Sequence, residues 1–149
     1  PIKLASTHNK YFVHLRHSAP FKLLQNNIWE HESELLKWTL CEGDFIEKLH
    51  GQPVPDIIFY DPFSPKTDGP MWTFSTFKKI HEYCAESNTS LYTYSNSTAV
   101  RATLLTGGFF VGYGVGTGPK TETTVAFKLF FSDHPEFNSI TYWASASLV

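Results

Sequence analysis

The sequence predicts an α/β fold in which a mostly parallel sheet is finished by an antiparallel hairpin. Between residues 38 and 109, runs with a strand pattern alternate with runs that have a helical period, and this alternation is typical of a parallel sheet covered by helices. Residues 109–113 and 123–130 then both resemble strands, with only a glycine-rich loop between them. A parallel crossover needs a dozen or more residues, so we expect the last strand to run antiparallel.

The first 36 residues have the weakest pattern. Residues 11–15 fit either a short strand or the end of a helix, and the residues alone leave both open. Apolar residues in 21–36 follow a helical period that Asn26 and Asn27 interrupt, which predicts one or two short helices. Residues 38–41 then predict the first strand of the sheet.

Strands and helices alternate through the middle of the chain. The predicted strands are 56–60 and 91–94, and the predicted helices are 44–49, 71–86 and 98–106. Gly51 follows the first of these helices, and Gly107 with Gly108 follows the last, where glycine commonly ends a helix. The continuous apolar run 57–60 is typical of a parallel strand that is buried on both faces.

A chain of 149 residues is long enough for one domain with a substantial core. We therefore expect a single domain over 1–149. Residues 1–36 would form a helical or irregular lead-in, 37–130 the α/β core, and 131–149 a loosely packed tail.

Composition narrows the function classes. The net charge is −2, so there is no overall basic character of the kind that nucleic-acid-binding domains show, and any RNA contact needs a local patch or a partner domain. Aromatic residues make up 16%, which suits both a core and stacking on nucleobases. Cys41 and Cys84 are far apart, which favours reduced cysteines in a cytoplasmic protein. No apolar run is long enough for a membrane span, and no signal peptide is visible.

Asp61 is the leading candidate for a catalytic residue. It directly follows the predicted strand 56–60, and Pro62 and Pro65 prevent that strand from continuing. Ligands of open α/β sheets bind outside the carboxyl ends of the strands, which is where this carboxylate lies. The alternative is that Asp61 only caps a helix or a turn, a common role of aspartate before proline.

Three other kinds of site are unsupported. The glycines of 112–118 lead into a strand rather than a helix, so they lack the helix amino terminus that a phosphate-binding loop needs; a flexible hairpin loop near a ligand is the better interpretation. The seven histidines show no metal-ligand spacing. No serine has the surroundings of a hydrolase nucleophile.

With these segments placed, the sequence resembles the methyltransferase domain of the bacterial tRNA 5-methylaminomethyl-2-thiouridine biosynthesis family. The resemblance covers about residues 36–128, and its most specific element is an Asp-x-Phe-Ser-Pro loop followed by a tryptophan. The matching motifs are Glu42-Gly43-Asp44-Phe45, Asp56-Ile57-Ile58-Phe59-Tyr60-Asp61-Pro62-Phe63-Ser64-Pro65, Met71-Trp72-Thr73, Thr93-Tyr94-Ser95, Val100-Arg101, Leu104, Gly108-Phe109 and Gly118-Pro119-Lys120-Thr121-Glu122.

The resemblance implies an enzyme that uses S-adenosylmethionine to methylate the aminomethyl group of the wobble uridine in tRNA, with a fused or partner oxidoreductase domain. It implies that Asp61 is catalytic and lies between the methyl group and the amine. The implied cofactor-binding residues are Gly43, Asp44, Phe45, Asp61 and Pro62. The implied substrate-binding residues are Phe63, Ser64 and Pro65 in the uridine pocket and Lys66, Arg101 and Lys120 on tRNA phosphates.

The resemblance also implies a class I methyltransferase sheet, Rossmann-like, with its first strands missing. No acidic-glycine loop of the kind that holds S-adenosylmethionine precedes Trp38, so the chain is expected to be the carboxyl-terminal part of that domain, and weak cofactor binding is expected of it alone. Three alternatives stay open: another amine substrate, an inactive interaction module, and a surface role only for Lys66, Arg101 and Lys120. Trp72 and Phe77 are expected in the core, because they continue a helical apolar face.

Overall fold

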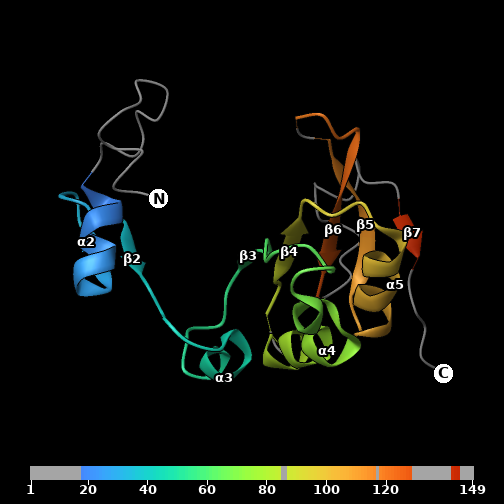
Figure 1. Ribbon diagram of the computed structural model, residues 1–149, viewed down its shortest axis with the longest axis horizontal. Coiled ribbons are helices and arrows are strands. Elements are labelled where there is room, and N and C mark those ends of the chain that lie inside the picture. The colour runs from blue at the N-terminus through green and yellow to red at the C-terminus, as the bar shows by residue number, and fades with distance from the viewer. Residues whose placement is uncertain (1–17, 85–86, 117, 129–141, 145–149) are drawn as a thin grey trace. The chain divides into compact units, whose positions relative to one another are not determined.

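The computed structural model describes residues 18–84, 87–116, 118–128 and 142–144 (Figure 1). The chain forms two compact units, Pro1–Asp44 and Phe45–Val149, and each is described by itself below. None of the helices in the described part of the chain is both long enough and apolar enough to cross a membrane.

The described part of the first unit, residues 18–44, contains one helix and one small hairpin. Helix α2 (Ala19–Asn26) ends at Asn27, which has a left-handed φ of 58°, a conformation that asparagine tolerates better than most residues. Strands β1 (Ile28–Glu30) and β2 (Lys37–Thr39) then pair antiparallel.

Of two predictions for this region, one is confirmed only in part and the other is wrong: α2 is the one short helix found in 21–36. The second half of the predicted helical segment 21–36 is strand and turn, because Asn27 ends the helix and the chain reverses before β2. The predicted first strand, 38–41, also belongs to this hairpin and not to the main sheet. Of the described strands it pairs only with β1, and the Trp29 ring packs edge-on against the Trp38 ring with 5.3 Å between their centroids.

The second unit is built on a mixed five-stranded sheet. Its strands lie in the order β3-β4-β6-β5-β7. Their bounds are β3 (Ile57–Phe59), β4 (Ser90–Thr93), β5 (Phe110–Val115), β6 (Glu122–Phe127) and β7 (Tyr142–Ala144). Strand β7 lies within the predicted tail, whose other residues, 131–141 and 145–149, are outside the described part.

The predicted hairpin is confirmed, because β5 and β6 pair antiparallel from Phe110↔Phe127 to Val115↔Glu122. The expected direction of β3, β4 and β5 is confirmed as well: β6 is antiparallel to both β4 and β5, so these two strands run the same way as β3. The hydrogen-bonded pairings, however, are mostly antiparallel. Among the described strands, only β3 and β4 pair parallel, and β6 pairs antiparallel with both β4 and β5. The reason is that β5 does not pair with β4, and β6, which folds back from β5 through a short turn, fills the space between them.

In the described part of this unit three helices accompany the sheet, and α4 and α5 lie on one face of it (Figure 1). They are α3 (Phe45–Leu49), α4 (Phe74–Tyr83) and α5 (Thr98–Thr106). Phe77 and Ile80 of α4 and Leu104 of α5 are fully buried in the core cluster, together with Leu91 of β4. Burial of such apolar surface is the main stabilising term in folding.

The predicted helix 71–86 begins later than expected. The 3₁₀ turn η2 (Gly69–Trp72) comes first, and α4 then begins after Thr73, whose hydroxyl accepts a hydrogen bond from the Thr76 N–H at 3.3 Å. A threonine in this position caps a helix, so η2 stays a separate turn next to the Asp61 loop.

The opposite face of the sheet is only partly covered by described residues. Side chains of a strand alternate between faces, so Ile57 and Phe59 of β3 share this face and are exposed, Phe59 at 82%. The prediction that residues 57–60 are buried on both faces is therefore wrong for the described chain. β3 lies at one edge of this sheet, and an edge strand has fewer neighbours to bury it.

Candidate functional site

Asp61 lies immediately beyond the carboxyl end of β3 and follows the buried residue Tyr60. It is exposed, and within the described part of the chain its carboxylate makes neither a hydrogen bond nor an ion pair. A capping or turn aspartate would accept a hydrogen bond from a nearby backbone N–H. No capping or turn contact of the Asp61 side chain is present among the described residues.

Three hollows of the surface meet at Asp61, because this residue lines each of them. The Phe45 hollow, of about 310 Å³, also contains Phe45, Ile58, Phe59, Tyr60, Pro62 and Met71. The Trp72 hollow, of about 220 Å³, also contains Pro62, Ser64, Pro65, Trp72, Tyr94, Ser95 and Lys120. The Tyr92 hollow, of about 430 Å³, also contains Phe59, Tyr60, Tyr92, Thr93, Tyr94, Val115 and Thr123.

The two smaller hollows separate the predicted cofactor residues from the predicted substrate residues. Phe45 lines only the Phe45 hollow, whereas Ser64 and Pro65 line only the Trp72 hollow. Asp61 and Pro62 line both. A group in one hollow would therefore meet a group in the other at the Asp61–Pro62 step.

The loop that carries Asp61 is anchored at both ends to the turn η2. The buried Tyr60 hydroxyl donates to the Met71 carbonyl oxygen, and the Trp72 indole N–H donates to the Phe63 carbonyl oxygen at 2.7 Å. The Trp72 ring also packs edge-on against the Tyr60 ring, with 5.4 Å between centroids. Burial, with a smaller contribution from Asp68, raises the pKa of Tyr60 well above its usual range, so Tyr60 stays a neutral donor.

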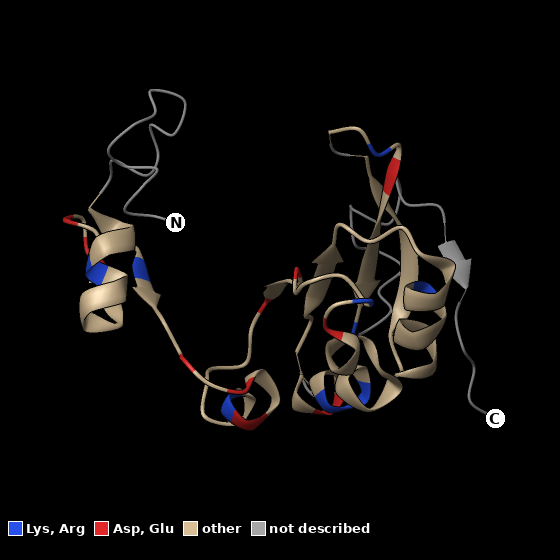
Figure 2. Cartoon of the chain, in the orientation of Figure 1, with Lys and Arg blue, Asp and Glu red and all other residues tan. Residues whose placement is uncertain are grey.

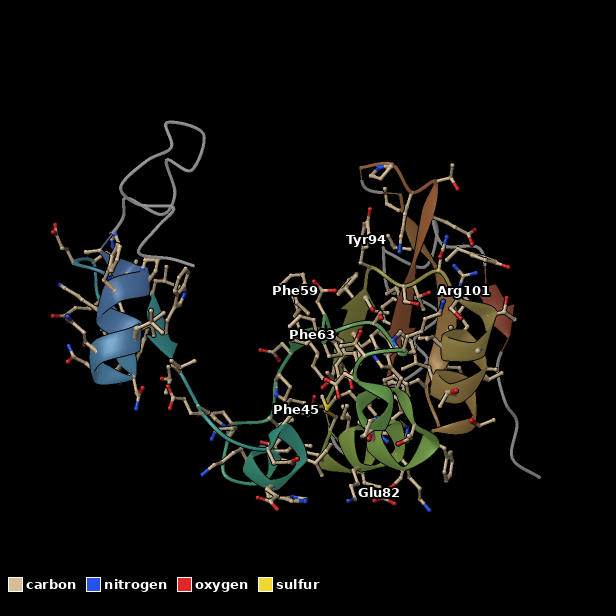
Figure 3. The ribbon with its side chains drawn as sticks, viewed as in Figure 1. Phe45, Phe59, Phe63, Glu82, Tyr94 and Arg101 are labelled. Atoms are coloured by element: carbon tan, nitrogen blue, oxygen red, sulfur yellow. The ribbon has the colours of Figure 1, made fainter. Side chains whose placement is uncertain are left out.

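Phe63 and Lys66 lie on the same loop and line none of the three hollows. Phe63 is 76% exposed, and Figure 3 labels it below Phe59, which lies at the end of β3. Lys66 is exposed and makes no ion pair with any described residue. Their predicted roles, in the uridine pocket and on a phosphate, remain predictions.

Lys120 is held in place by Tyr94, the residue that follows β4. Its ammonium donates a hydrogen bond to the Tyr94 carbonyl oxygen at 2.6 Å and lies 4.0 Å from the centre of the Tyr94 ring. An ammonium above an aromatic face is attracted by the ring. These contacts place Lys120 on the wall of the Trp72 hollow.

Arg101 is not available for a tRNA phosphate, so the structure corrects this prediction. The residue is 3% exposed, and its guanidinium forms an ion pair with Glu122 at 2.9 Å. It also donates to the Thr124 hydroxyl and to the Thr123 carbonyl oxygen, both at 3.0 Å. Arg101 therefore joins α5 to the start of β6, and its expected surface position, whether on a phosphate or in solvent, is wrong.

Gly43 and Asp44 belong to the first unit, Pro1–Asp44, so their predicted contacts with the cofactor stay predictions. Gly43 has a φ of 132°, which favours glycine. Asp44 is exposed.

The sequence interpretation missed two walls of the site. Trp72 was expected in the core, and it does pack against the core cluster, but it also lines the hollow beside Asp61. Tyr94, labelled in Figure 3, borders two of the three hollows. Its position just after a strand, where the carboxyl ends of parallel strands gather, was a usable signal. Nowhere among the described residues do three or more His, Cys, Asp or Glu side chains gather as a metal site would require.

Comparison with known proteins agrees with this geometry. A family model described as S-adenosyl-L-methionine-dependent methyltransferase matches residues 7–129. The tRNA 5-methylaminomethyl-2-thiouridine biosynthesis bifunctional protein MnmC of Paracidovorax citrulli is 38% identical over 89 residues, which are 59% of this chain and 14% of that protein. An uncharacterized protein of Methanocaldococcus jannaschii is 33% identical over 73 residues, 49% of this chain and 20% of its own length.

A solved structure gives the same result for the fold. The crystal structure of MNMC2 from Aquifex aeolicus superposes with a TM-score of 0.59 at 30% identity, over 80% of this chain and 38% of that one. The chain thus spans at most about two fifths of these relatives' own lengths. Since the family model covers most of the sequence, the chain belongs to the S-adenosyl-L-methionine-dependent methyltransferases, with S-adenosylmethionine as the family's cofactor.

Proposed function

We propose that this methyltransferase transfers the methyl group to a primary amine held at Asp61, and that the amine is the aminomethyl group of a wobble uridine in tRNA. The observation that carries the proposal is the unpaired Asp61 carboxylate at the meeting point of the Phe45 and Trp72 hollows. The Paracidovorax citrulli relative is named for tRNA 5-methylaminomethyl-2-thiouridine biosynthesis, which supports the choice of tRNA uridine.

The residues around the Phe45 hollow fit part of the cofactor. The side chains of Phe45, Ile58 and Met71 make this hollow mostly apolar, which suits a flat ring such as adenine. Phe45, Pro62 and Asp61 would hold S-adenosylmethionine from this side, and Gly43 and Asp44 are proposed to complete the contacts. When bound, S-adenosylmethionine supplies an electrophilic methyl group.

The chemistry of the amine explains why a carboxylate is useful here. A protonated amine has no free lone pair, so the amine must be neutral and correctly aimed before it can accept a methyl group. Asp61 can accept hydrogen bonds from the amine and take up its proton, and proton acceptance by a positioned side chain typically contributes about a hundred- to ten-thousand-fold in rate. Holding two reactants in line contributes more.

The rest of the protein's biology is proposed on the same basis. We propose that Phe63, Ser64 and Pro65 border the bound uridine and that the exposed Lys66 contacts the RNA backbone. Figure 2 shows positive and negative residues interspersed on α3 and α4 rather than one basic surface, so most of the tRNA affinity is proposed to come from other parts of the protein. The proposal includes a cytoplasmic location and an associated oxidoreductase domain, in keeping with the Paracidovorax citrulli relative, which is named bifunctional.

The test is methyl transfer by the complete gene product. Purified protein is incubated with S-adenosylmethionine carrying an isotopically labelled methyl group and with tRNA that contains 5-aminomethyl-2-thiouridine, and the RNA is digested and examined by mass spectrometry. We expect labelled 5-methylaminomethyl-2-thiouridine from this tRNA and no label in a matched tRNA with an unmodified wobble uridine. Label on another nucleoside, or none on either tRNA while S-adenosylmethionine binds, would contradict the proposed substrate.

A further inference from the structure

The Trp72 hollow contains two opposite charges that are not paired with each other. Asp61 and Lys120 both line it, yet no ion pair joins them, and neither forms one elsewhere in the described part of the chain. Because the Asp61 carboxylate and the Lys120 ammonium do not pair with each other, both can interact with a ligand in this hollow. A ligand that suits both would have a hydrogen-bond donor at one end and an acceptor at the other.

The ammonium of Lys120 is held in place and still has donors to give. An ammonium has three N–H donors, and the Tyr94 carbonyl oxygen takes one of them at 2.6 Å. The Tyr94 ring, 4.0 Å away, holds the group from another side. Fixing a long lysine side chain in advance reduces the entropy that binding would otherwise cost.

The other walls of the hollow favour a flat ligand. Trp72 and Tyr94 are both aromatic, and nucleobases stack on such side chains in RNA-binding sites. Trp72 is fixed by its indole hydrogen bond to the Phe63 carbonyl oxygen and by its packing against Tyr60. The hollow thus combines an amine acceptor, a cationic donor and aromatic surfaces.

We propose that Lys120 determines base specificity: it donates a hydrogen bond to the ring carbonyl oxygen that neighbours the aminomethyl arm while Asp61 holds the amine. This inference rests on the proposed function and replaces the predicted contact of Lys120 with a phosphate. A 5-aminomethyluracil ring carries the arm on C5 and a carbonyl oxygen on the adjacent C4. A 5-aminomethylcytosine ring carries an amino group on C4, which offers N–H donors where Lys120 needs an acceptor.

The experiment compares two RNA anticodon stem-loops that differ only in the wobble base, 5-aminomethyluridine or 5-aminomethylcytidine. For the complete gene product, we expect kcat/KM to be higher on the uridine RNA by about ten- to a hundredfold, the usual worth of a hydrogen bond to a charged group. In Lys120→Met this preference should collapse, because kcat/KM falls on the uridine RNA and hardly changes on the cytidine RNA. Lys120→Arg, which keeps a cationic donor, should retain part of the preference.

The matched control is Lys79→Met, since Lys79 is an exposed lysine of α4 that lines none of the three hollows. It should leave the preference unchanged, and urea unfolding should show that both methionine variants are folded. If Lys120→Met weakens both RNAs equally, keeps the preference and makes RNA binding less dependent on salt, Lys120 contacts a phosphate and the inference is wrong.

Failure of the proposed function is recognised separately, by equilibrium binding of the free bases 5-aminomethyluracil and 5-aminomethylcytosine. Suppose that no RNA is methylated, while 5-aminomethyluracil binds more tightly than 5-aminomethylcytosine and this difference depends on Lys120. That result would reject the proposed reaction and keep the role of Lys120 in base specificity. Equal binding of the two bases, or binding of neither, would overturn the role of Lys120 itself.

Discussion

The buried guanidinium of Arg101 is held by Glu122, Thr124 and the Thr123 carbonyl oxygen, and it lies 4.4 Å from the centre of the Tyr113 ring. Arg101→Met keeps much of the apolar side chain and removes the charge and all of its donors. Removing one partner of a buried ion pair typically costs 3–5 kcal/mol. Because the Glu122 side chain is 39% exposed and can be hydrated, we expect the free energy of unfolding to fall by about 3 kcal/mol, the lower end of that range.

Urea unfolding measures this loss, and Lys78→Met is the comparison. Lys78 forms an exposed ion pair with Glu82 at 3.9 Å on α4, and exposed pairs contribute about 0–1 kcal/mol. A loss of that small size in Arg101→Met would mean that the Arg101 network does not stabilise the fold.

His81 predicts how stability depends on pH. It packs edge-on against Phe109, and the Lys128 ammonium donates to its Nε2 atom at 2.9 Å. Burial, and secondarily the positive charge of Lys128, lowers the pKa of His81 in the folded protein. The unfolded chain therefore binds the proton more tightly, and the free energy of unfolding should fall as the pH drops below about 6.5, the ordinary pKa of histidine, down to the lower folded pKa.

Urea unfolding at about pH 7.5 and about pH 5.5, on either side of the ordinary histidine pKa, measures the decrease. His81→Phe keeps an aromatic ring and cannot titrate, so its stability should change less between the two pH values than that of the wild type. Equal changes in the two proteins would assign the pH dependence to other groups.

At the residue scale, the sequence alone predicted the position of Asp61 but not the contacts of Arg101 and Lys120. Asp61 was predicted from its place after a strand, a local property of the chain. The roles of Arg101 and Lys120 depend on their contacts with Glu122, Thr124 and Tyr94. These partners are distant in sequence, and they come close because β6 pairs with β4 and β5. The sequence alone does not tell whether a basic residue forms a buried ion pair, as Arg101 does, or lines a hollow, as Lys120 does.

At the scale of elements, the loop from Asp61 to η2 depends on Trp72. Trp72→Phe keeps an aromatic ring against Tyr60 and Phe77 but loses the indole N–H that holds the Phe63 carbonyl oxygen. We expect the free energy of unfolding to fall by about 1 kcal/mol, the usual net value of one hydrogen bond. We also expect kcat for methyl transfer to fall, by more than this loss of stability would explain, because the loop that positions Asp61 is held less firmly.

Thr73→Ala is the matched control, because it removes the cap of α4 and should cost a similar amount, about 1 kcal/mol. Stability is measured by urea unfolding, and kcat and KM are measured for both variants. Similar stability losses with a much lower kcat only in Trp72→Phe would support a positioning role. Equal turnover in the two variants would contradict it.

Most helices and strands of the described chain were predictable from the sequence, whereas one helix end and the order of the strands were not. Helix α5 and its glycine end were confirmed with the predicted bounds, 98–106, because the hydrophobic period and the C-terminal glycines agree. The prediction of one or two short helices in 21–36 was right for α2 only, because Asn27 takes a left-handed conformation and ends that helix. The position of β6 between β4 and β5 was not predicted, because the hydrophobic pattern of each strand does not determine the order of strands in the sheet.

At the scale of the whole molecule, β3 has an apolar face that the described residues leave exposed. Parallel strands of α/β proteins are normally covered on both faces, whereas Ile57 and Phe59 are exposed here. The family and the α/β class were predictable from the sequence, and the comparisons confirm them. The expectation of a single domain over residues 1–149 stays a prediction.

Asp61 links the family's chemistry to this fold, so its substitution is the most direct test. Methyl transfer to aminomethyluridine tRNA is measured for the complete gene product and for Asp61→Ala, Asp61→Asn and Asp56→Ala, with cofactor binding and urea unfolding measured alongside. Asp56 is an exposed aspartate at the other end of β3, and its variant should remain active. We predict that Asp61→Ala abolishes transfer, that Asp61→Asn retains a little because it keeps one acceptor oxygen, and that both fold normally. A loss of about a hundred- to ten-thousand-fold is typical when a general base is removed; unchanged turnover in Asp61→Ala would show that Asp61 is only a loop residue.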